Sequence, residues 1–341
     1  MAGAGERAYV FARACGIISK SWVVRRRIAP LRAVNRLAEL DRLIFAGSAK
    51  ELPEKELLRD LEGRLIRRSV AQIVSIIGSY KHPPEVLIRL LKVYEYADLK
   101  TIVALARDKV LPRQPPDHAD ISPYAAIRHD AWPDLAAMLE GSEYAFIIDR
   151  RGELAVIPDG KDGGITVETA LDRDYYGKLW KSLFTLKKSD RVVSEKIIRE
   201  EIALRNCAWV LRLRTYYGMK ADEVRRHLVT VEGEHFTADA EAALELPLDN
   251  REAWTRWKRF NFLNGGAFPW RADPRFFQNG ASEYLYRLAM RNMRVRPLSI
   301  DTAFCFIKLK QFEEDLLTSY AEGLALGMSS EDFPGVLEAA W

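Results

Sequence analysis

The sequence predicts an all-α protein made of three similar helical lobes. Three long helical patterns carry this prediction, from Glu85 to about Arg107, from about Glu195 to Tyr217 and from about Ile300 to Glu322. In each, apolar residues recur every three to four positions over a wide stripe, which indicates a helix buried against several neighbours. The three patterns also recur at a nearly constant interval along the chain, which points to one repeated helical unit.

The first long helix is entered through His82-Pro83-Pro84 and begins at Glu85. Proline is tolerated in the first turn of a helix, and a carboxylate suits the positive end of the helix dipole. Asp98 interrupts the apolar stripe of this helix. A carboxylate buried in such a stripe must be paired or protonated. We expect Asp98 to form a structural ion pair.

The ends of the other two long helices are predicted from their capping residues. Ser194 is a suitable N-cap for the second helix, and Gly218 can supply the left-handed residue that ends it. Ser299 is the expected cap of the third helix, with Asp301 in its first turn and Gly323 as its stop.

The repeat has a period near 110 residues. Asp98, Asn206 and Leu316 occupy comparable positions in the three helices, 108 and 110 residues apart. Another helical segment precedes each of them by about 35 residues, as expected for a recurring helix–loop–helix. These preceding segments are Leu61–Ile77, Leu171–Leu186 and Glu283–Met293. We predict lobes over residues 1–115, 116–225 and 226–341.

Charge is distributed unevenly although the net charge of the 341-residue chain is only +4. Residues 1–50 carry ten Lys/Arg against three Asp/Glu, and residues 299–341 carry two against eight. This asymmetry favours oriented docking on a partner, with solvated helix faces as the alternative. Within the basic end, Arg25, Arg26 and Arg27 form the candidate docking surface.

The compartment is predicted from cysteines and hydropathy. Cys15, Cys207 and Cys305 are odd in number and far apart, so we expect reduced thiols and no disulfide framework. No stretch approaches the roughly 18 uninterrupted apolar residues of a membrane span. We therefore expect a protein on the cytoplasmic side whose association with a membrane is peripheral.

Signatures of catalysis are missing from the sequence. It contains no G-x-x-x-x-G-K-[ST], G-x-S-x-G, H-E-x-x-H or C-x-x-C motif. His227 and His235 flank Glu232 and Glu234, but their spacing matches no standard metal site. We therefore expect no catalytic residue, no cofactor and no metal.

A basic run near the C-terminal end, Arg287–Arg296, is interleaved with Tyr284, Tyr286 and Met290. Aromatic and basic residues together occur in nucleic-acid-binding grooves. At helical spacing, however, the aromatic residues and Met290 fit a core, and the arginines fit a polar face. We predict no nucleic-acid partner.

The C-terminal helix resembles a known family signature. The stretch from Pro297-Leu298-Ser299-Ile300 through Lys310-Gln311-Phe312-Glu313 to Gly323 is similar to the closing signature of the C-type subunits of V-type and archaeal-type ATPases, whose eukaryotic counterpart is the d-type subunit. Lys310, Glu313 and Gly323 stand at matching positions. Gln311 replaces the usual Glu of the signature and Leu316 its Asn, so this chain lacks two of the polar groups.

The resemblance extends over nearly the whole chain. Similar motifs occur, in the same order as in the family, at Tyr9–Arg13, at Asp98-Leu99, at Leu139–Tyr144, at Leu171–Tyr176 and at Asn206. The resemblance assigns Asp98, Asn206, Lys310, Glu313 and Gly323 to the structural motif of the family and assigns none of them to catalysis.

The resemblance implies a funnel of three similar lobes around a pseudo-threefold axis. Its wide end would sit on the membrane proteolipid ring and its cavity would receive the shaft of subunits D and F, so the chain would be a non-catalytic central-stalk subunit that couples rotation to ion transport. A helical-repeat adaptor for other protein partners remains the alternative, which co-purification separates from the first. A nucleic-acid-binding module would show salt-dependent gel shifts.

Overall fold

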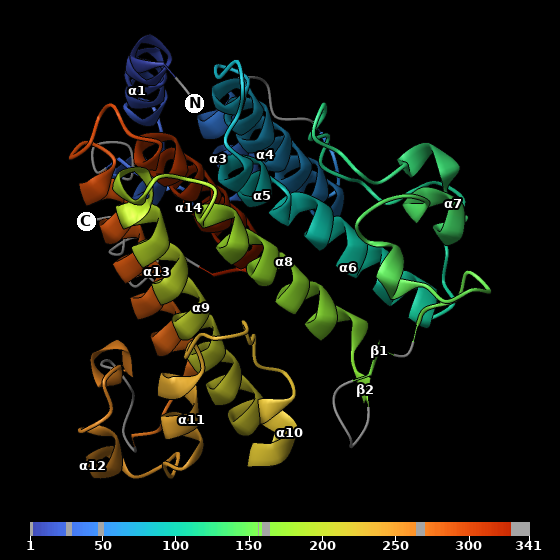
Figure 1. Ribbon diagram of the computed structural model, residues 1–341, viewed down its shortest axis with the longest axis vertical. Coiled ribbons are helices and arrows are strands. Elements are labelled where there is room, and N and C mark those ends of the chain that lie inside the picture. Colours follow the sequence, from blue (N-terminus) through green and yellow to red (C-terminus); the bar gives the residue numbers. More distant parts are fainter. Residues whose placement is uncertain are drawn as a thin grey trace. The chain divides into compact units, whose positions relative to one another are not determined.

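The computed structural model describes residues 3–24, 29–46, 51–155, 157–158, 164–263 and 270–328. Most of these residues are helical, and the all-α prediction is confirmed. The described strands are two residues each, β1 (Ile157–Pro158) and β2 (Gly164–Ile165), which pair antiparallel. The chain divides into two compact units, and Figure 1 labels the helices that belong to them. Unit 1 comprises Met1–Leu87, Lys188–Ile197 and Asn279–Trp341, and unit 2 comprises Ile88–Lys187 and Ile198–Gln278.

Unit 1 is built around two long helices from opposite ends of the chain. Helix α4 (Glu54–Ile77) packs along α14 (Asp301–Ala325), and α1 (Ala4–Ile18) and α3 (Leu37–Phe45) pack against both. A short 3-10 helix, η1 (Ala29–Ala33), precedes α3. The core of this packing consists of leucines, an isoleucine and aromatic residues from three of the helices and the segment before α3. They include Trp22, Leu31, Leu37, Leu40, Ile44, Leu61, Leu65, Leu317 and Tyr320.

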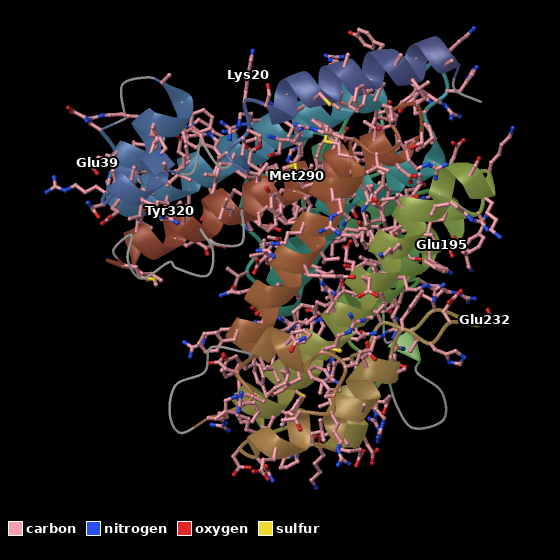
Figure 2. All side chains as sticks on the ribbon, turned by 90° about the vertical axis from the view of Figure 1, so that its left-hand side faces the viewer. Lys20, Glu39, Glu195, Glu232, Met290 and Tyr320 are labelled. Atoms are coloured by element: carbon pink, nitrogen blue, oxygen red, sulfur yellow. The ribbon has the colours of Figure 1, made fainter. Side chains whose placement is uncertain are left out.

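Tyr320 joins the C-terminal helix to the N-terminal part of the chain. Its hydroxyl donates to the backbone oxygens of Leu31 at 2.7 Å and Val34 at 3.1 Å. Figure 2 shows Tyr320 on α14, next to the helix α3 that carries Glu39. A buried phenol needs such a partner, because an unpaired hydroxyl in an apolar core is costly.

Unit 2 contains the helix pair α6 (Val93–Arg107) and α8 (Val167–Leu183), which pack against each other. Helix α9 (Lys188–Tyr217) contributes its residues from Ile198 onward. The other described elements of unit 2 are short: α7 (Leu135–Leu139), α10 (Ala221–Arg225), α11 (Ala238–Leu244), α12 (Arg251–Trp254) and the 3-10 helices η2 (His129–Ala131), η3 (Ala145–Ile147) and η4 (Phe260–Leu263).

Three helices are divided between the units, and one of them is α9, which passes from unit 1 to unit 2 after Ile197. Helix α5 (Glu85–Leu91) begins in unit 1, and α13 (Pro274–Asn292) begins in unit 2. The first long helical pattern is confirmed from Glu85 to Arg107, but a turn at Lys92 divides it into α5 and α6. The three preceding segments are also helical, as α4, α8 and α13. The lobe boundaries at 115 and 225 stay a prediction.

Of the four residues predicted to cap or end the second and third long helices, three are wrong and one is right. Helix α9 begins at Lys188, so Ser194 lies inside it, where its backbone N–H donates to the Asp301 carboxylate at 3.1 Å. Ser299 does not cap α14, whose N-cap is Ile300, and Gly323 lies buried within that helix, which continues to Ala325. Gly218 ends α9 with a positive φ of 62°, a left-handed conformation that glycine adopts without strain.

Candidate functional site

The five predicted motif residues fall into the two units. Lys310, Glu313 and Gly323 lie on α14 in unit 1, whereas Asp98 on α6 and Asn206 on α9 lie in unit 2. Arg25, Arg26 and Arg27, the candidate docking surface, lie outside the residues that the structure describes. Each motif residue that carries a hydrogen-bonding side chain is buried or half-buried and holds a specific partner.

Lys310 and Glu313 form an ion pair inside unit 1. A spacing of three residues brings both side chains to one face of α14, and each side chain is only 2% exposed. The second carboxylate oxygen of Glu313 accepts the backbone N–H of Trp22 at 2.6 Å. Burial works against the charge on Glu313, but the Lys310 ammonium and the Trp22 N–H outweigh it, and the pKa of Glu313 is lowered. The Glu313 carboxylate therefore stays ionised at neutral pH, and its bond to Trp22 holds the segment after α1 against α14.

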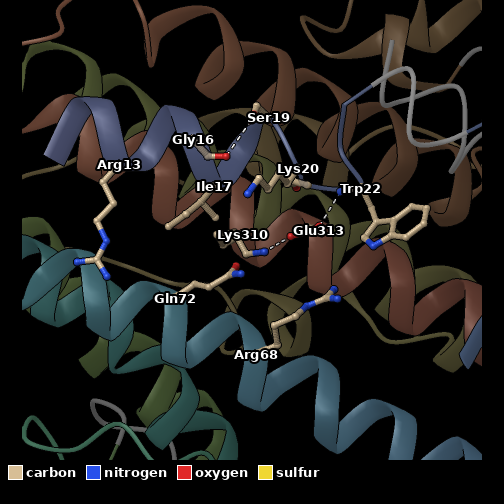
Figure 3. Close-up of a pocket in the computed structure, with 11 residues that line it drawn as sticks. Arg13, Gly16, Ile17, Ser19, Lys20, Trp22, Arg68, Gln72, Lys310 and Glu313 are labelled. Carbon is tan, nitrogen blue, oxygen red and sulfur yellow. Dashed lines mark hydrogen bonds and ion pairs between the residues drawn. The ribbon is translucent and has the colours of Figure 1, made fainter. Parts of the chain in front are cut away.

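A pocket of about 360 Å³ opens beside this pair (Figure 3). Its walls come from α1 and the residues after it, from α4 and from α14. Figure 3 shows Arg13 reaching from α1 toward α4, and Gln72 of α4 turned toward Lys310 and Glu313. The lining residues are Arg13, Gly16, Ile17, Ser19, Lys20, Ser21, Trp22, Arg68, Gln72, Lys310 and Glu313. Four cations and one carboxylate line the pocket, which leaves an excess of positive charge.

Asn206 is fully buried in unit 2 and uses both ends of its amide. Its Oδ1 accepts the backbone N–H of Val229 at 2.8 Å, and its Nδ2 donates to the backbone oxygens of Val229 at 2.9 Å and Phe236 at 3.3 Å. An asparagine can satisfy backbone donors and acceptors at once, as a peptide group does. Asn206 therefore holds the irregular segment after α10 against α9.

Asp98 has a similar place on α6 but no cationic partner among the described residues. Its Oδ2 accepts the backbone N–H of Ala119 at 3.3 Å. Burial raises the pKa of Asp98 to about 7, the nearby Glu95 adds to the rise, and the Ala119 N–H opposes it. The ion pair expected from the sequence is not formed in the described part of the chain, and the carboxyl group is protonated in a large fraction of molecules near neutral pH.

Glu95 is a buried anchor that the sequence reasoning missed. It accepts the backbone N–H groups of Ala126 and, at 3.1 Å, of Ile127, together with the Tyr144 hydroxyl at 2.7 Å. The Lys92 ammonium lies 3.2 Å from its carboxylate. The available signal was its spacing, because Glu95 lies four residues from both Leu91 and Leu99 and thus on the apolar face of the helix.

A second polar cluster in unit 2 surrounds Arg259, which is 8% exposed. Its guanidinium donates to Glu200 at 2.6 Å and to Asp239 at 2.7 Å. Burial disfavours the charge on Arg259, but the two carboxylates outweigh this and raise its pKa. Lys258 lies 3.5 Å from Asp239.

The ATP synthase (C/AC39) subunit family matches residues 46–333 of this chain. The chain belongs to this family. The match includes α4, α6, α8, α9 and α14, the last of which carries Lys310 and Glu313. An uncharacterized protein of Treponema pallidum (strain Nichols) is 27% identical over 332 residues, which are 94% of this chain and 92% of that protein.

Membership of the C/AC39 family makes the chain a subunit of a V- or A-type ATPase. Residues 46–333 include all five motif residues named above, and the resemblance proposed from the C-terminal signature is confirmed at the level of the family. Within the described ranges, no helix is long and apolar enough to cross a membrane.

The histidines and cysteines considered in the sequence analysis form no catalytic or metal-binding cluster among the described residues. His227 contacts Thr169 at 3.3 Å, while His118 and His129 stack with ring centroids 3.8 Å apart. In the part of the chain that the structure describes, no group of three or more His, Cys, Asp or Glu side chains is arranged to hold a metal ion. Cys207 and Cys305 are buried free thiols, and Cys15 is a half-buried one.

Proposed function

We propose that the chain is the non-catalytic central-stalk subunit of a V- or A-type ATPase, which couples the shaft of subunits D and F to the membrane proteolipid ring during ion transport. The observation that carries this proposal is the family match over residues 46–333. Long helices alternate with irregular segments that buried side chains hold against them. Such a structure is suited to a subunit that transmits force through its shape. The proposed location is the cytoplasmic side of the membrane, held there through the complex.

A coupling subunit must resist deformation, and the described helices are built to do so. Helices α4 and α14 contain 24 and 25 residues, which corresponds to a length of about 36 Å each. Their contact is apolar where Leu61 and Leu65 of α4 join the same core as Leu317 and Leu324 of α14. Buried side chains then tie irregular segments to the long helices through backbone N–H groups, so that torque on a segment is passed to a helix.

The anchors also support the proposed arrangement in three lobes. Asp98 of the first predicted lobe holds Ala119 of the second, and Asn206 of the second holds Val229 of the third. Glu313 of the third holds Trp22 of the first. A cyclic order of this kind is what a ring of three similar lobes needs, since each lobe then receives the start of its neighbour. We propose the pseudo-threefold funnel on this ground.

Co-purification tests the proposal directly. The tagged chain is isolated from membranes dissolved in mild detergent, and the associated proteins are identified by mass spectrometry. We expect the shaft subunits D and F and the ring proteolipid in constant ratio. Recovery of unrelated soluble proteins without any ATPase subunit would favour the adaptor and would overturn the proposal.

The docking role of Arg25, Arg26 and Arg27 is tested separately, against the purified shaft and the purified ring. Replacing the three arginines by glutamate should slow association with one of these partners, because opposite charge at an interface steers encounter. The effect should shrink with added salt, since at 0.15 M the screening length is about 8 Å. Association rates unchanged for both partners at low salt would remove the cluster from the interface.

The non-catalytic role predicts that the isolated chain does not turn over ATP. Phosphoryl transfer requires positioned phosphate ligands and a metal, and the sequence contains no phosphate-binding loop of the usual kind. The measurement is phosphate release by the repurified chain. Activity that survives repurification and is lost on a point substitution in this chain would contradict the role.

A further inference from the structure

The pocket beside Lys310 and Glu313 holds more positive charge than its own carboxylate can neutralise. Arg13, Lys20 and Arg68 have no carboxylate within ion-pair distance in the described ranges. Glu313 is already paired with Lys310 and with the Trp22 N–H. Glu314 lies near enough to act on Arg68 and Lys310, but it is not part of the lining. An excess of three positive charges therefore faces one cavity.

The cations are held in place by groups that do not cancel their charge. Arg13 donates to the Ser75 backbone oxygen at 3.0 Å and to the Ser79 hydroxyl at 3.1 Å. Arg68 stacks on Phe45, with its guanidinium carbon 5.1 Å from the ring centroid. Neutral partners of this kind fix the position of a cation and leave it able to attract an anion.

Two buried atoms at the pocket lack partners in the described part of the chain. They are Nε of Arg68, which is a donor, and Oε1 of Gln72, which is an acceptor. Buried polar atoms are nearly always paired, so an unpaired donor and an unpaired acceptor at one cavity indicate a ligand with both functions. Burial lowers the pKa of Arg68. The pKa of Lys310 is lowered by burial and also by repulsion from the Arg68 guanidinium. A bound anion would relieve the repulsion between these two cations.

We propose that this pocket binds a phosphate monoester, with the phosphate between Lys20, Arg68 and Lys310 and with a hydroxyl of the ligand, which can be the P–OH of its monoanion, donating to Gln72. A phosphate monoester carries a charge between −1.5 and −2 at neutral pH, which offsets the excess better than a single carboxylate does. The volume of about 360 Å³ lies at the lower end of small-molecule sites and exceeds the space of a bare phosphate ion. The ester's organic part packs against Ile17 and Trp22.

This site goes beyond the proposed coupling role and does not depend on it. A phosphate monoester is available either as a soluble metabolite or as the headgroup of a phospholipid. Both present the same chemistry to the pocket, so the experiment uses both. The whole isolated chain is titrated calorimetrically with glycerol 3-phosphate and with inorganic sulfate. It is also sedimented with phosphatidylcholine vesicles that contain or lack phosphatidic acid.

The variants are chosen for their position. Lys20→Gln changes an exposed side chain, and Arg68→Gln removes the stacked guanidinium. Gly16→Glu places a carboxylate at a helical position where an added Cβ has no atom within 4 Å, so it adds negative charge without a clash. Arg67→Gln is the matched control, because Arg67 is an exposed neighbour on α4 that does not line the pocket.

We expect glycerol 3-phosphate or the phosphatidic acid vesicles to bind, and sulfate to bind more weakly because it cannot donate to Gln72. Lys20→Gln and Arg68→Gln should each raise the Kd by about tenfold or more, as expected for charge-assisted hydrogen bonds. Gly16→Glu should abolish binding, and Arg67→Gln should leave the Kd unchanged. Binding to the vesicles alone would identify a lipid headgroup as the ligand.

Three outcomes would overturn the proposal. The first is that neither phosphate probe binds at millimolar concentration to a chain with normal helical content. The second is that Arg67→Gln weakens binding as much as Lys20→Gln, which would indicate diffuse surface charge. The third is full binding by Gly16→Glu. Because Lys20→Gln and Gly16→Glu alter exposed positions, they test the site even where Arg68→Gln fails to fold.

Discussion

Arg68 in unit 1 and Arg259 in unit 2 each line a pocket that is rich in basic side chains, but only Arg259 forms ion pairs with carboxylates in the described ranges. Arg259 is held between Glu200 and Asp239, and the other basic side chains of its pocket, Arg199 and Lys258, are each paired with a carboxylate. Arg68 stacks on a ring and has no carboxylate partner in the described ranges. An arginine compensated within its own unit serves the fold, whereas an uncompensated positive charge remains available to a ligand.

The largest effect is expected where the single carboxylate of the unit 1 pocket is removed. Glu313→Gln leaves the buried Lys310 ammonium unpaired and weakens the bond to the Trp22 N–H. Breaking one partner of a buried pair destabilises by about 3–5 kcal/mol. Chemical denaturation of the variant measures this loss. A loss below about 1 kcal/mol would show that the pair contributes little and would remove the basis for contrasting the two pockets.

The corresponding change in unit 2 is Arg259→Met, which keeps the unbranched stem of the side chain, removes the cation from Glu200 and leaves Asp239 with only the exposed Lys258. We expect a loss of about 3 kcal/mol in the free energy of unfolding, somewhat less than for Glu313 because the two carboxylates keep partial contact with water. Chemical denaturation measures this loss, and a loss below about 1 kcal/mol would contradict the compensated arrangement.

Asp98 extends the comparison to a carboxylate without a cation. Its folded-state pKa of about 7 lies above the ordinary value of 3.8, so between pH 4 and 7 the folded chain binds more protons than the unfolded chain. The free energy of unfolding therefore falls as pH rises through this interval and levels off above it. A shift of this size corresponds to roughly 4 kcal/mol, and partial contact with water should reduce it to about half.

Asp98→Asn tests this dependence. The amide oxygen still accepts the Ala119 N–H, but no charge is buried. We expect the variant to be more stable than the wild type at pH 8 by about 2 kcal/mol and to differ little at pH 5. Thermal unfolding at the two pH values is the measurement. Equal effects at both pH values would mean that Asp98 does not titrate in this range.

The smallest effect is expected for Arg68→Gln. The substitution removes the stacking of Arg68 on Phe45 but also relieves the repulsion between Arg68 and Lys310. Because these two effects oppose each other, we expect the free energy of unfolding to fall by less than about 1 kcal/mol. Chemical denaturation of Arg68→Gln and of Arg259→Met is measured under the same conditions. Destabilisation as large as that of Arg259→Met would place Arg68 among the structural arginines and would contradict its assignment to a ligand.

The sequence was most informative where a single side chain departs from a local period. Asp98 was found because it interrupts an apolar stripe, and Lys310 and Glu313 because they match a family signature. Helix positions followed from the same periodicity. Where the predicted ends were wrong, at Ser194, Ser299 and Gly323, tertiary packing carried a helix past a residue that caps or breaks helices in isolation, or moved its start by one or two residues.

The pockets were not predictable from local pattern. Arg259 meets Glu200 across 59 residues and Asp239 across 20, and Glu313 meets Trp22 across 291. Periodicity reports which face of a helix is buried and does not report which other segment covers it. Glu95 was missed for the same reason, because its partners Ala126 and Ile127 belong to a region whose irregular backbone gives no periodic signal.

The discontinuous make-up of unit 1 has a consequence for biosynthesis. Helices α3 and α4 bury their apolar faces against Leu317, Tyr320 and Leu324, which are among the last described residues to leave the ribosome. Closing a loop of about 290 residues costs about 5 kcal/mol in chain entropy when the intervening chain is unfolded. Unit 2 lies between these ends in the sequence, and its earlier folding shortens the span that remains to be closed. Until α14 emerges, the N-terminal helices are exposed to chaperones and proteases, and a nascent chain that stops before Leu317 leaves them permanently so.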